Sequence, residues 1–470
     1  MKILLVNPPN RNMITTNVPS VVDEETGFYP PLGLMYVASY LKEHSPHSVH
    51  ILDAQVEKVN YKQLKEKISR INPDIVGIQA TTFTLIDSML TAKIVKELNK
   101  NIKVVLGGPH VNIFPDETIS IKDVDYLVLG EGERTFTELI KHIDNKARLN
   151  SINNLVFEHN NRVIHTKKGN LIEDLDFLPF PARELTPYKK YHSLLAKKSP
   201  ITTMMTSRGC PYKCLFCDRP HLGKKFRYRA AENVVDEMEH CIQLGIKEIF
   251  LYDDTFTINR QRVLDICSEI KARKLDIAWD IRARVNTVDY EILKALKKAG
   301  CERIHYGVEA GNPEILKILR KGITLEQAKK AFKMTRKLGI QTLAYFMLGN
   351  PGEGKKEILE SIKLSKQLKP DFVHFSITTP FPSTGLYRLG LEKGILSHDY
   401  WKEFAKSPSR DFQPELWEEK LTREELIQLL RYAYKKFYMR PTYITKSLFK
   451  INSFEEFKKK AKAGLRLFGM

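Results

Sequence analysis

The feature that most constrains the fold of this chain is an alternation of short apolar segments with amphipathic helical patterns, which occurs twice. The first run covers residues 1–145 and the second covers residues 200–380. Such an alternation predicts parallel strands joined by helical crossovers. Between the runs, residues 146–199 contain a hairpin pattern and the proline-punctuated connector Leu178-Pro-Phe-Pro181. A chain of 470 residues is also too long for one ordinary domain, so we expect two α/β domains.

The first run predicts a doubly wound, Rossmann-like sheet. Its expected strands are residues 2–6, 49–53, 75–80, 103–107 and 126–129. Ligands of such sheets bind beyond the carboxyl ends of the strands, where small residues let a backbone approach a large ligand closely. The candidate binding residues at these ends are Asn7, Pro8, Thr81, Thr82, Gly107, Gly108, His110, Gly130, Glu131 and Gly132.

The second run predicts a partial barrel of six βα units rather than a complete barrel of eight. Its expected strands are residues 201–206, 248–252, 278–282, 303–306, 341–347 and 372–377. Active sites of parallel barrels lie at the carboxyl ends of the strands. The candidate site residues at these ends are Asp253, Asp254, Arg284, Glu309 and Gly349.

Three cysteines, Cys210, Cys214 and Cys217, stand in a C-x3-C-x2-C loop directly after the first barrel strand. The other cysteines, at positions 241, 267 and 301, are scattered downstream in expected helices or beside a strand, so we interpret them as structural thiols. The spacing of the loop fits three corners of a [4Fe–4S] cube, which leaves one iron open to an outside ligand. A zinc site that lacks its fourth ligand is the alternative.

With Phe216 just before Cys217, this loop resembles the signature of the radical SAM superfamily. The resemblance implies that S-adenosylmethionine (SAM) binds the open iron and yields a 5′-deoxyadenosyl radical when the cluster is reduced. It also implies that the acids at 253, 254 and 309 hold the amino group and ribose of SAM, and that Arg284 holds its carboxylate. Phe216 and Gly349 would lie against the same ligand. These residue types suit a ligand with one ammonium, one diol and one carboxylate.

The loops of the first domain carry a second resemblance. The segments Tyr29-Pro-Pro-Leu-Gly-Leu34, Gly107-Gly-Pro-His110 and Gly130-Glu-Gly-Glu133 resemble the cobalamin-binding domain of one radical SAM subfamily. That subfamily contains C-methyltransferases, the anaerobic magnesium-protoporphyrin ester cyclase, and enzymes that modify hopanoids and ether lipids. The D-x-H-x-x-G motif of other cobalamin domains is replaced here by Asn7-Pro8-Pro9, so the lower face of cobalt should be unligated or bound to water. His110 is the alternative ligand, although a loop histidine of this kind more often forms hydrogen bonds.

The C-terminal region, residues 381–470, is expected to be mainly helical and to cap the substrate, with a helix at 422–439. The chain has a net charge of +19, and its last 40 residues hold eleven basic and two acidic side chains. Residues 440–470 also contain aromatic side chains, a composition typical of a helix that rests on an anionic membrane face or of an ordinary packing helix with solvated lysines. No nucleic-acid-binding module accompanies the charge, so we expect no nucleic-acid partner.

Taken together, these patterns predict a cobalamin-dependent radical SAM enzyme with a [4Fe–4S] cluster, SAM and cobalamin. We expect it to methylate an unactivated carbon of a hydrophobic lipid, isoprenoid or tetrapyrrole, with an external electron donor of the ferredoxin or flavodoxin type. An oxidative cyclase with the same cofactors is the first alternative, and a non-catalytic protein that binds cobalamin or SAM is the second. No signal peptide or long apolar run is present, so we expect a cytoplasmic protein that is peripheral to the inner membrane face if its tail binds lipid.

Overall fold

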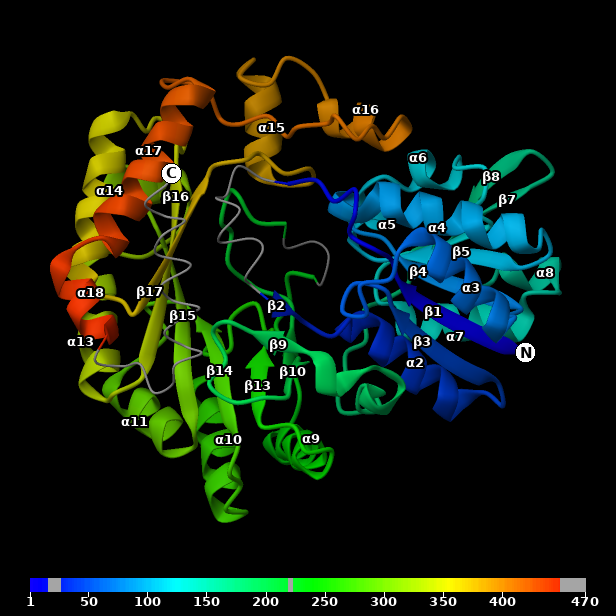
Figure 1. Cartoon of the computed structure of the whole chain (residues 1–470), viewed down its shortest axis with the longest axis horizontal. Coiled ribbons are helices and arrows are strands. Elements are labelled where there is room, and N and C mark those ends of the chain that lie inside the picture. Colours follow the sequence, from blue (N-terminus) through cyan, green and yellow to red (C-terminus); the bar gives the residue numbers. More distant parts are fainter. Residues whose placement is uncertain (16–26, 219–222, 449–470) are drawn as a thin grey trace.

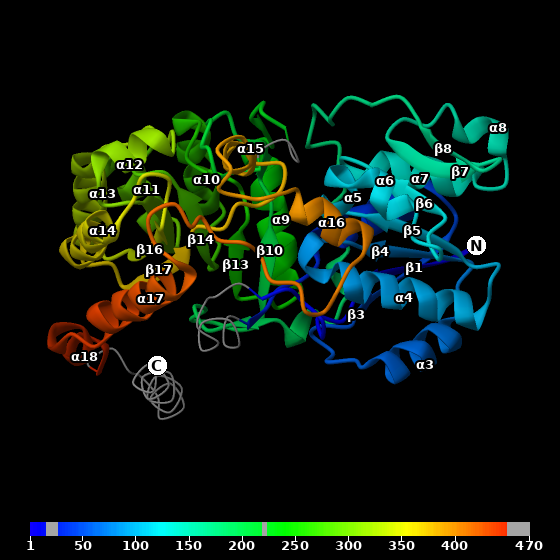
Figure 2. The same ribbon diagram turned by 90° about the horizontal axis from the view of Figure 1, so that it is seen from above.

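The structure is a computed structural model, and it describes residues 1–15, 27–218 and 223–448. Two α/β bodies lie side by side, and a helical segment from the C-terminal region bridges them (Figures 1 and 2). The N-terminal body is built on a seven-stranded sheet and the second body on a six-stranded sheet. None of the described helices combines the length and apolarity that a membrane crossing requires.

The N-terminal sheet has the strand order β3-β1-β4-β5-β6-β7-β8. The first five strands in this order are parallel, as predicted, and the β7–β8 hairpin extends the sheet in antiparallel fashion beside β6. The hairpin that the sequence places in the connector is therefore part of this sheet. The strands are β1 (Lys2–Asn7), β3 (Ser48–Asp53), β4 (Ile75–Gln79), β5 (Lys103–Gly107), β6 (Tyr126–Val128), β7 (Leu155–His159) and β8 (Arg162–His165).

Helices cover both faces of this sheet, which explains why its central strands are apolar on both sides. Residues of α2 (Leu32–His44), α7 (Gly132–His142) and α8 (Lys146–Leu149) form the core on one face. Residues of α3 (Tyr61–Ile71), α4 (Leu85–Leu98), α5 (Pro109–Ile113) and α6 (Pro115–Ile119) form the core on the other. The sequence analysis did not find the two short helices α5 and α6, each of which starts at a proline.

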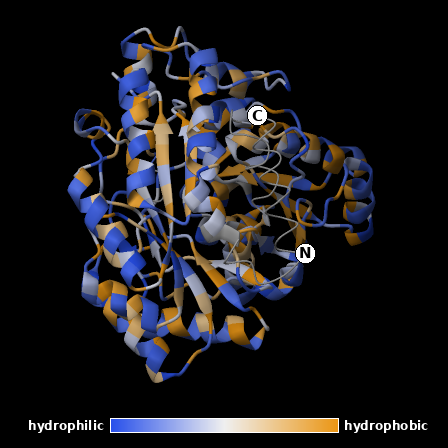
Figure 3. Ribbon diagram, turned by 60° about the vertical axis from the view of Figure 1, so that its left-hand side comes forward, coloured by the Kyte–Doolittle hydropathy of each residue, from blue (hydrophilic) through white to orange (hydrophobic). Residues whose placement is uncertain are grey.

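The second body is an open barrel of six parallel strands in the order β10-β13-β14-β15-β16-β17, which confirms the prediction of six βα units. Hydrophobic residues concentrate in the strands, and hydrophilic residues lie along the helices outside them (Figure 3). The strands are β10 (Ile201–Met204), β13 (Glu248–Leu251), β14 (Ala278–Ala283), β15 (Cys301–Glu309), β16 (Gln341–Leu348) and β17 (Phe372–Ile377). The outer helices are α9 (Ala231–Gln243), α10 (Arg260–Ala272), α11 (Tyr290–Lys298), α12 (Pro313–Ile318), α13 (Leu325–Lys337) and α14 (Lys355–Leu368).

The connector between the two bodies forms hydrogen bonds with both of them. Its short strand β9 (His192–Ser193) pairs with β2 (Gly27–Phe28) from the N-terminal body. Tyr191 is fully buried and donates a hydrogen bond to Asp53 at the end of β3. Arg183, in the 3₁₀ helix η2 (Arg183–Leu185), donates to Thr203 and to Glu237 of the barrel. These contacts fix the two bodies relative to each other.

A bridge from the C-terminal region packs against the carboxyl-end loops of the N-terminal sheet. The helices α15 (Gly385–Glu392) and α16 (Tyr400–Lys406) lie between the two bodies (Figure 2). Trp401 and Phe404 share a hydrophobic cluster with Phe114 and Leu85 of the N-terminal body. The hydroxyl of Tyr400 donates to the carbonyl of Pro380 at 3.0 Å, which anchors the bridge where the chain leaves the last barrel strand.

The helix α17 (Arg423–Tyr438), predicted at 422–439, closes the edge of the barrel beside β17. The Tyr434 hydroxyl accepts from the amide of Phe375 at 3.2 Å and donates to its carbonyl at 2.9 Å. Tyr438 makes the same pair of bonds with Val373. The tyrosines therefore satisfy backbone groups that an edge strand would otherwise expose. The short helix α18 (Pro441–Leu448) follows.

We predict that Tyr434→Phe lowers the free energy of unfolding by about 2 kcal/mol, because two buried backbone groups of Phe375 lose their hydrogen-bond partner. Urea denaturation followed by circular dichroism measures this loss. Tyr432→Phe is the matched control, because Tyr432 lies on the same helix and is 42% exposed. Equal stability of the two variants would contradict the role of Tyr434 at the strand edge.

Candidate active site

The cysteine loop leaves the carboxyl end of β10 and is held on several sides. The short strands β11 (Ser207–Arg208) and β12 (Arg227–Tyr228) pair at its base. The amide of Leu215 donates to the carbonyl of Leu319 in the barrel, and the carbonyl of Leu215 accepts from the amide of Leu386 in α15. The loop is therefore fixed by both the barrel and the C-terminal bridge.

The three cysteines of the loop are accessible, in contrast to the other three. Cys217 is exposed and Cys210 and Cys214 are half-buried, whereas Cys241, Cys267 and Cys301 are buried. Burial, followed by the charges of Cys214 and Asp254, raises the pKa of Cys217 to about 12. The pKa of the Cys210 thiol is also raised, so both of these thiols would be deprotonated by binding to cations such as the irons of a cluster. No three potential ligands converge on one ion in the described part of the chain, and a cube spaces its thiolates more widely than a single ion does.

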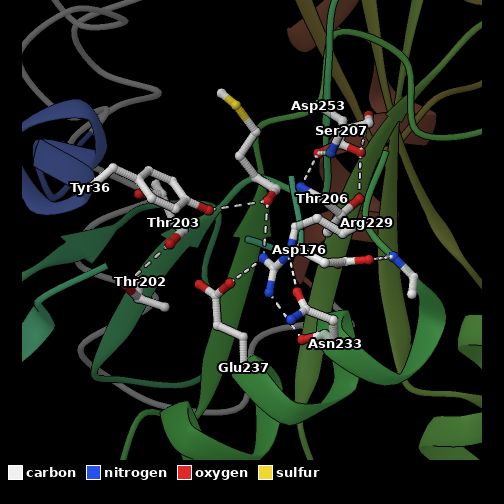
Figure 4. A network of polar contacts seen from close by, with 12 residues as sticks. Tyr36, Asp176, Thr202, Thr203, Thr206, Ser207, Arg229, Asn233, Glu237 and Asp253 are labelled. Atoms are coloured by element: carbon white, nitrogen blue, oxygen red, sulfur yellow. Dashed lines mark hydrogen bonds and ion pairs between the residues drawn. The ribbon is translucent and has the colours of Figure 1, made fainter. Parts of the chain in front are cut away.

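Asp253 and Asp254, which were predicted together, have different surroundings. Asp253 is fully buried, and its carboxylate accepts four hydrogen bonds of 2.5–3.1 Å from the amides and hydroxyls of Thr206 and Ser207 (Figure 4). The hydrogen-bond acceptor sites of Asp253 are therefore used within the protein. These bonds also fix the direction in which the chain enters the cysteine loop. Asp254 is exposed and lies close enough to Cys210 and Cys217 to raise the pKa of both thiols. Of the two acids, Asp254 is the one available to a ligand.

Arg284, the expected partner of the SAM carboxylate, lies beside the cysteine loop. Its Nη1 is 3.6 Å from the sulfur of Cys214, and its guanidinium stacks on the ring of Tyr212 with 3.8 Å to the centroid. It also donates to the carbonyls of Lys321 and Gly322. The arrangement places a positive charge next to one of the three cysteines of the loop.

Glu309, at the end of β15, is paired with a lysine that sequence reasoning missed. Lys321 Nζ lies 2.7 Å from Glu309 Oε1, and both side chains are less than a tenth exposed. Glu309 has a φ of 70°. A Cβ on the neighbouring Gly307 would lie 2.4 Å from Glu309 Oε1, so glycine is needed there to admit the carboxylate. Lys321 Nζ is also 5.8 Å from the centroid of the Phe216 ring, which places the pair beside the cysteine loop.

The glycine segment after β16 is shaped by packing as well as by its place near the site. Gly349 has a φ of 78°, and a Cβ there would lie 2.6 Å from the side chain of Leu426 in α17. Glu353, four residues on, accepts two hydrogen bonds of 2.9 Å from Asn350. Burial raises the pKa of Glu353 to about 7.

The raised pKa of Glu353 predicts a pH-dependent stability. Its ordinary pKa is 4.5, so the folded state holds the proton more tightly than the unfolded state, and stability falls as pH rises from about 4.5 to about 7. Glu353→Gln removes this dependence. We therefore expect the variant to gain roughly 2–3 kcal/mol relative to wild type between pH 5 and pH 8, measured by urea denaturation.

Glu357 supplies a control of opposite sign for this experiment. Its carboxylate accepts from the amide of Gly354 at 2.9 Å, and backbone hydrogen bonds lower its pKa. Glu357→Gln should therefore lose stability relative to wild type as pH rises. A pH-independent difference between Glu353→Gln and wild type would contradict the assignment.

The predicted cobalamin-contacting residues lie at the carboxyl edge of the N-terminal sheet. Asn7 donates to Asp53 at 2.8 Å, and the carbonyl of Pro8 accepts from Gln55 at 3.1 Å. Thr81 caps the 3₁₀ helix η1 (Thr82–Thr84) that follows β4. These side chains shape the loops, and most of their polar atoms are already engaged there.

Glycines leave open backbone at the ends of β5 and β6. Gly108 has a φ of 116°, and a Cβ there would lie 2.7 Å from the carbonyl oxygen of Ala80, whereas a Cβ on Gly107 would meet nothing closer than 3.8 Å. Asn112 joins the two loops, because it donates to the carbonyl of Gly108 and accepts from the amide of Gly130 at 2.6 Å. Gly130, with a φ of 67°, and Gly132 then lead into α7. This edge offers backbone rather than side chains to a large ligand.

His110 is fully buried within this edge. Its Nδ1 is 3.1 Å from the Thr82 hydroxyl, and its Nε2 has no hydrogen-bond partner among the described residues. Burial lowers its pKa to about 4, so the imidazole is neutral near pH 7. The buried position and the bond to Thr82 agree with a histidine that forms hydrogen bonds.

Glu131 is not placed at the open edge. Its carboxylate lies between the two bodies, where it accepts from Arg208, from Arg227 and from the amide of Ile172. The sequence analysis missed Arg208 and Arg227, although both flank the cysteine motif closely. The only sequence signal for these arginines is that they lie close to the cysteine motif. Ion pairs with glutamates so far away in the chain leave no periodic pattern in the sequence.

Comparisons with known proteins agree with this architecture. The chain matches the radical SAM superfamily over residues 204–365 and the B12 binding domain over residues 20–140. It is 38% identical to an uncharacterized methyltransferase of Pyrococcus horikoshii, over 97% of this chain and 96% of that protein. It is 29% identical to the anaerobic magnesium-protoporphyrin IX monomethyl ester cyclase of Rubrivivax gelatinosus, over 94% and 78% of the two chains.

Solved structures show the same fold. The cobalamin-dependent SAM radical enzyme OxsB with aqua-cobalamin matches with a TM-score of 0.75 at 19% identity, over 99% of this chain and 72% of that one. The radical SAM methyltransferase TsrM of Kitasatospora setae, with cobalamin and a [4Fe–4S] cluster bound, matches with a TM-score of 0.67 at 20% identity, over 84% and 78%.

Fold and site together define a radical SAM enzyme with an N-terminal B12-binding domain. The chain belongs to the cobalamin-binding radical SAM family that contains methyltransferases and the anaerobic magnesium-protoporphyrin cyclases. Its cofactors are a [4Fe–4S] cluster, SAM and cobalamin. The predicted family, fold class, enzyme class and cofactors are confirmed.

Proposed function

We propose that this enzyme transfers a methyl group to an unactivated carbon of a hydrophobic substrate. The observation that carries the proposal is that the carboxyl edges of the two sheets meet. Glu131 directly follows Gly130 at the carboxyl edge of the N-terminal sheet. It contacts Arg208, which precedes Cys210 by two residues. Cobalamin at one edge and the cluster at the other would therefore face a shared space. The similarity to methyltransferases favours methyl transfer over cyclisation.

The residues that would hold the cofactors have suitable chemistry. Cys210, Cys214 and Cys217 would ligate the cluster, which leaves one iron for SAM. The open glycine backbone between positions 107 and 132 would carry cobalamin. When bound, the cluster and SAM supply a hydrogen-abstracting radical, and cobalamin supplies the methyl group.

The protein itself orients these groups. Asp254 and Glu309 would accept hydrogen bonds from the ammonium and hydroxyl groups of SAM, while Arg284 and Lys321 would bind its carboxylate. Phe216 and Gly349 would also border SAM. An external one-electron donor of the ferredoxin or flavodoxin type would reduce the cluster.

The interior of the barrel supports an amphipathic substrate. Strand alternation directs Ile281 and Ala283 of β14 into the helix-facing core, so Arg282 between them points inward. The same argument directs Tyr252, Tyr345 and His374 inward from their strands, and all three are half-buried. One of these rings, that of Tyr252, stacks on the Arg282 guanidinium, and the rings of Tyr345 and His374 lie against each other. We propose that this interior accepts a hydrophobic body that carries an acidic group.

Arg282 differs from most buried arginines of the chain. Its guanidinium stacks on Tyr252 with 4.1 Å to the ring centroid, and no carboxylate oxygen of the described residues lies within 4 Å of it. Arg183, Arg229 and Arg303 each have a carboxylate within that distance. An inward cation without a carboxylate is suited to an anion from outside the chain.

The proposed reaction is tested by anaerobic reconstitution with iron, sulfide and hydroxocobalamin, followed by incubation with tetrapyrrole and hopanoid substrates. We expect S-adenosylhomocysteine and 5′-deoxyadenosine in equal amounts, together with a product heavier by one methylene unit. Release of 5′-deoxyadenosine alone with a new ring in the product would show cyclisation and overturn the proposal.

The substrate class is tested with protoporphyrin IX and its dimethyl ester, which differ only in their carboxylates. We predict that Arg282→Gln binds the acid about tenfold more weakly, or about 1.4 kcal/mol, and the ester as wild type does, measured by fluorescence titration. Arg260→Gln is the control, because Arg260 pairs with Asp289 at the surface. Weaker binding of SAM with unchanged binding of both porphyrins would instead assign Arg282 to SAM.

We also propose that the C-terminal tail contacts a membrane surface. The basic, aromatic tail that suggests it falls mainly on residues 449–470, which lie outside the described residues. A peripheral contact with anionic lipid would bring the enzyme to a hydrophobic substrate. Sedimentation with phosphatidylglycerol vesicles tests it.

A further inference from the structure

The turn Gly130-Glu131-Gly132-Glu133 makes a buried ionic contact with the base of the cysteine loop. Glu131 Oε1 lies 3.0 Å from Arg208 Nη1 and 2.9 Å from Arg227 Nη1. Glu133 Oε1 lies 2.6 Å from Arg208 Nη2. All four side chains are at most 6% exposed. We call Glu131, Glu133, Arg208 and Arg227 the interdomain clamp.

The two arginines of the clamp are direct neighbours across the β11–β12 pairing. Arg208 lies opposite Arg227 in the register, and both project toward the N-terminal body. Arg208 also lies over the ring of Tyr36 in α2, with 5.2 Å to the centroid. Cys210 follows Arg208 by only two residues. A shift of the clamp therefore moves the first cluster ligand directly.

The segment between β10 and the cysteines is held from both bodies. On the barrel side, Asp253 binds Thr206 and Ser207, and Arg229 donates to the carbonyl of Met205 (Figure 4). On the other side, the Tyr36 hydroxyl donates to the same carbonyl at 3.3 Å. The clamp adds the strongest contacts from that side, because both partners are charged.

The clamp also reaches the loop that would carry cobalamin. Its two glutamates alternate with Gly130 and Gly132 in one turn, and Asn112 ties Gly130 to the Gly108 loop. Buried ion pairs contribute little net stability compared with apolar packing. They do, however, penalise any arrangement in which a charge loses its partner. Such a contact suits the fixing of a distance better than the strengthening of a fold.

We propose that the interdomain clamp sets the position of the cobalamin site relative to the cluster, and that Glu131 is a positioning residue rather than a cobalamin contact. The proposal relies on the cofactor placement proposed above but not on the outcome of the reaction. It gives the turn from Gly130 to Glu133 a role in both cofactor sites.

The test measures the distance between cob(II)alamin and the reduced cluster by pulsed electron paramagnetic resonance, in the full chain loaded with both cofactors. We expect one narrow distance distribution in wild type and a distribution at least twice as wide in Glu131→Gln. The hydroxocobalamin affinity of the variant should stay within about threefold of wild type, because its glycine backbone is intact. Iron content should stay at four per chain.

Glu173→Gln is the matched control. Glu173 follows Ile172, whose amide binds Glu131, and it pairs with Lys225 near Arg227 on the same hairpin. This pair is 63–69% exposed, so its loss should leave the distance distribution unchanged. The comparison separates the clamp from a general effect of removing a carboxylate.

Two results would overturn the proposal. A tenfold or greater loss of hydroxocobalamin affinity with an unchanged distance distribution would make Glu131 a cobalamin contact. A lower melting temperature and iron content with an unchanged distribution would make the clamp purely structural. Glu133→Gln removes the charge of only one ion pair, that with Arg208, and provides a milder variant if Glu131→Gln folds poorly. Because no substrate is added, failure of the proposed methyl transfer leaves this readout intact.

Discussion

The buried carboxylate of Asp253 is the interaction on which the geometry of the site depends. Its four hydrogen bonds to Thr206 and Ser207 determine how the chain turns as it leaves β10. This turn sets the direction of the residues that follow directly, which include Arg208 of the clamp and Cys210, the first cysteine of the loop. A carboxylate that accepts four hydrogen bonds is held at a defined place in the barrel. The barrel thus fixes the position at which the cysteine loop begins.

A second constraint is that the layer beneath the site is charged and buried. Within this layer, Arg183 and Arg229 both pair with Glu237, and the clamp lies beside them. Arg183 of the connector pairs with Glu237 of the barrel, and Arg208 pairs with Glu131 of the N-terminal body. These ion pairs therefore form only when the connector, the barrel and the N-terminal body are docked together. The physical consequence is a specific arrangement of domains rather than a large gain in stability.

Sequence reasoning reached the parts of this protein that are encoded locally. The barrel strands, the helix at 422–439 and the cysteine motif follow from periodicity and spacing, and the structure has them within a few residues. The division of labour between Asp253 and Asp254 was not predictable, because adjacent acids look alike until burial separates them. The pairing of Glu131 with Arg208 spans 77 residues and leaves no local signal. Lys321 was missed for a similar reason, since its partner Glu309 is fixed by the return of the chain after α12.

The open barrel makes the two bodies interdependent. Six strands do not close on themselves, so each free side must be covered by another part of the chain. Helix α17 covers the β17 side with its tyrosine hydroxyls. On the β10 side, the ring of Tyr29 from the N-terminal body packs against Phe250 of β13 and against Tyr252, which directly follows that strand. Because Tyr252 points into the barrel beside Arg282, the N-terminal body contributes to the inner surface as well as to the cofactor edge. The inner surface of the barrel is therefore complete only when both bodies are docked together.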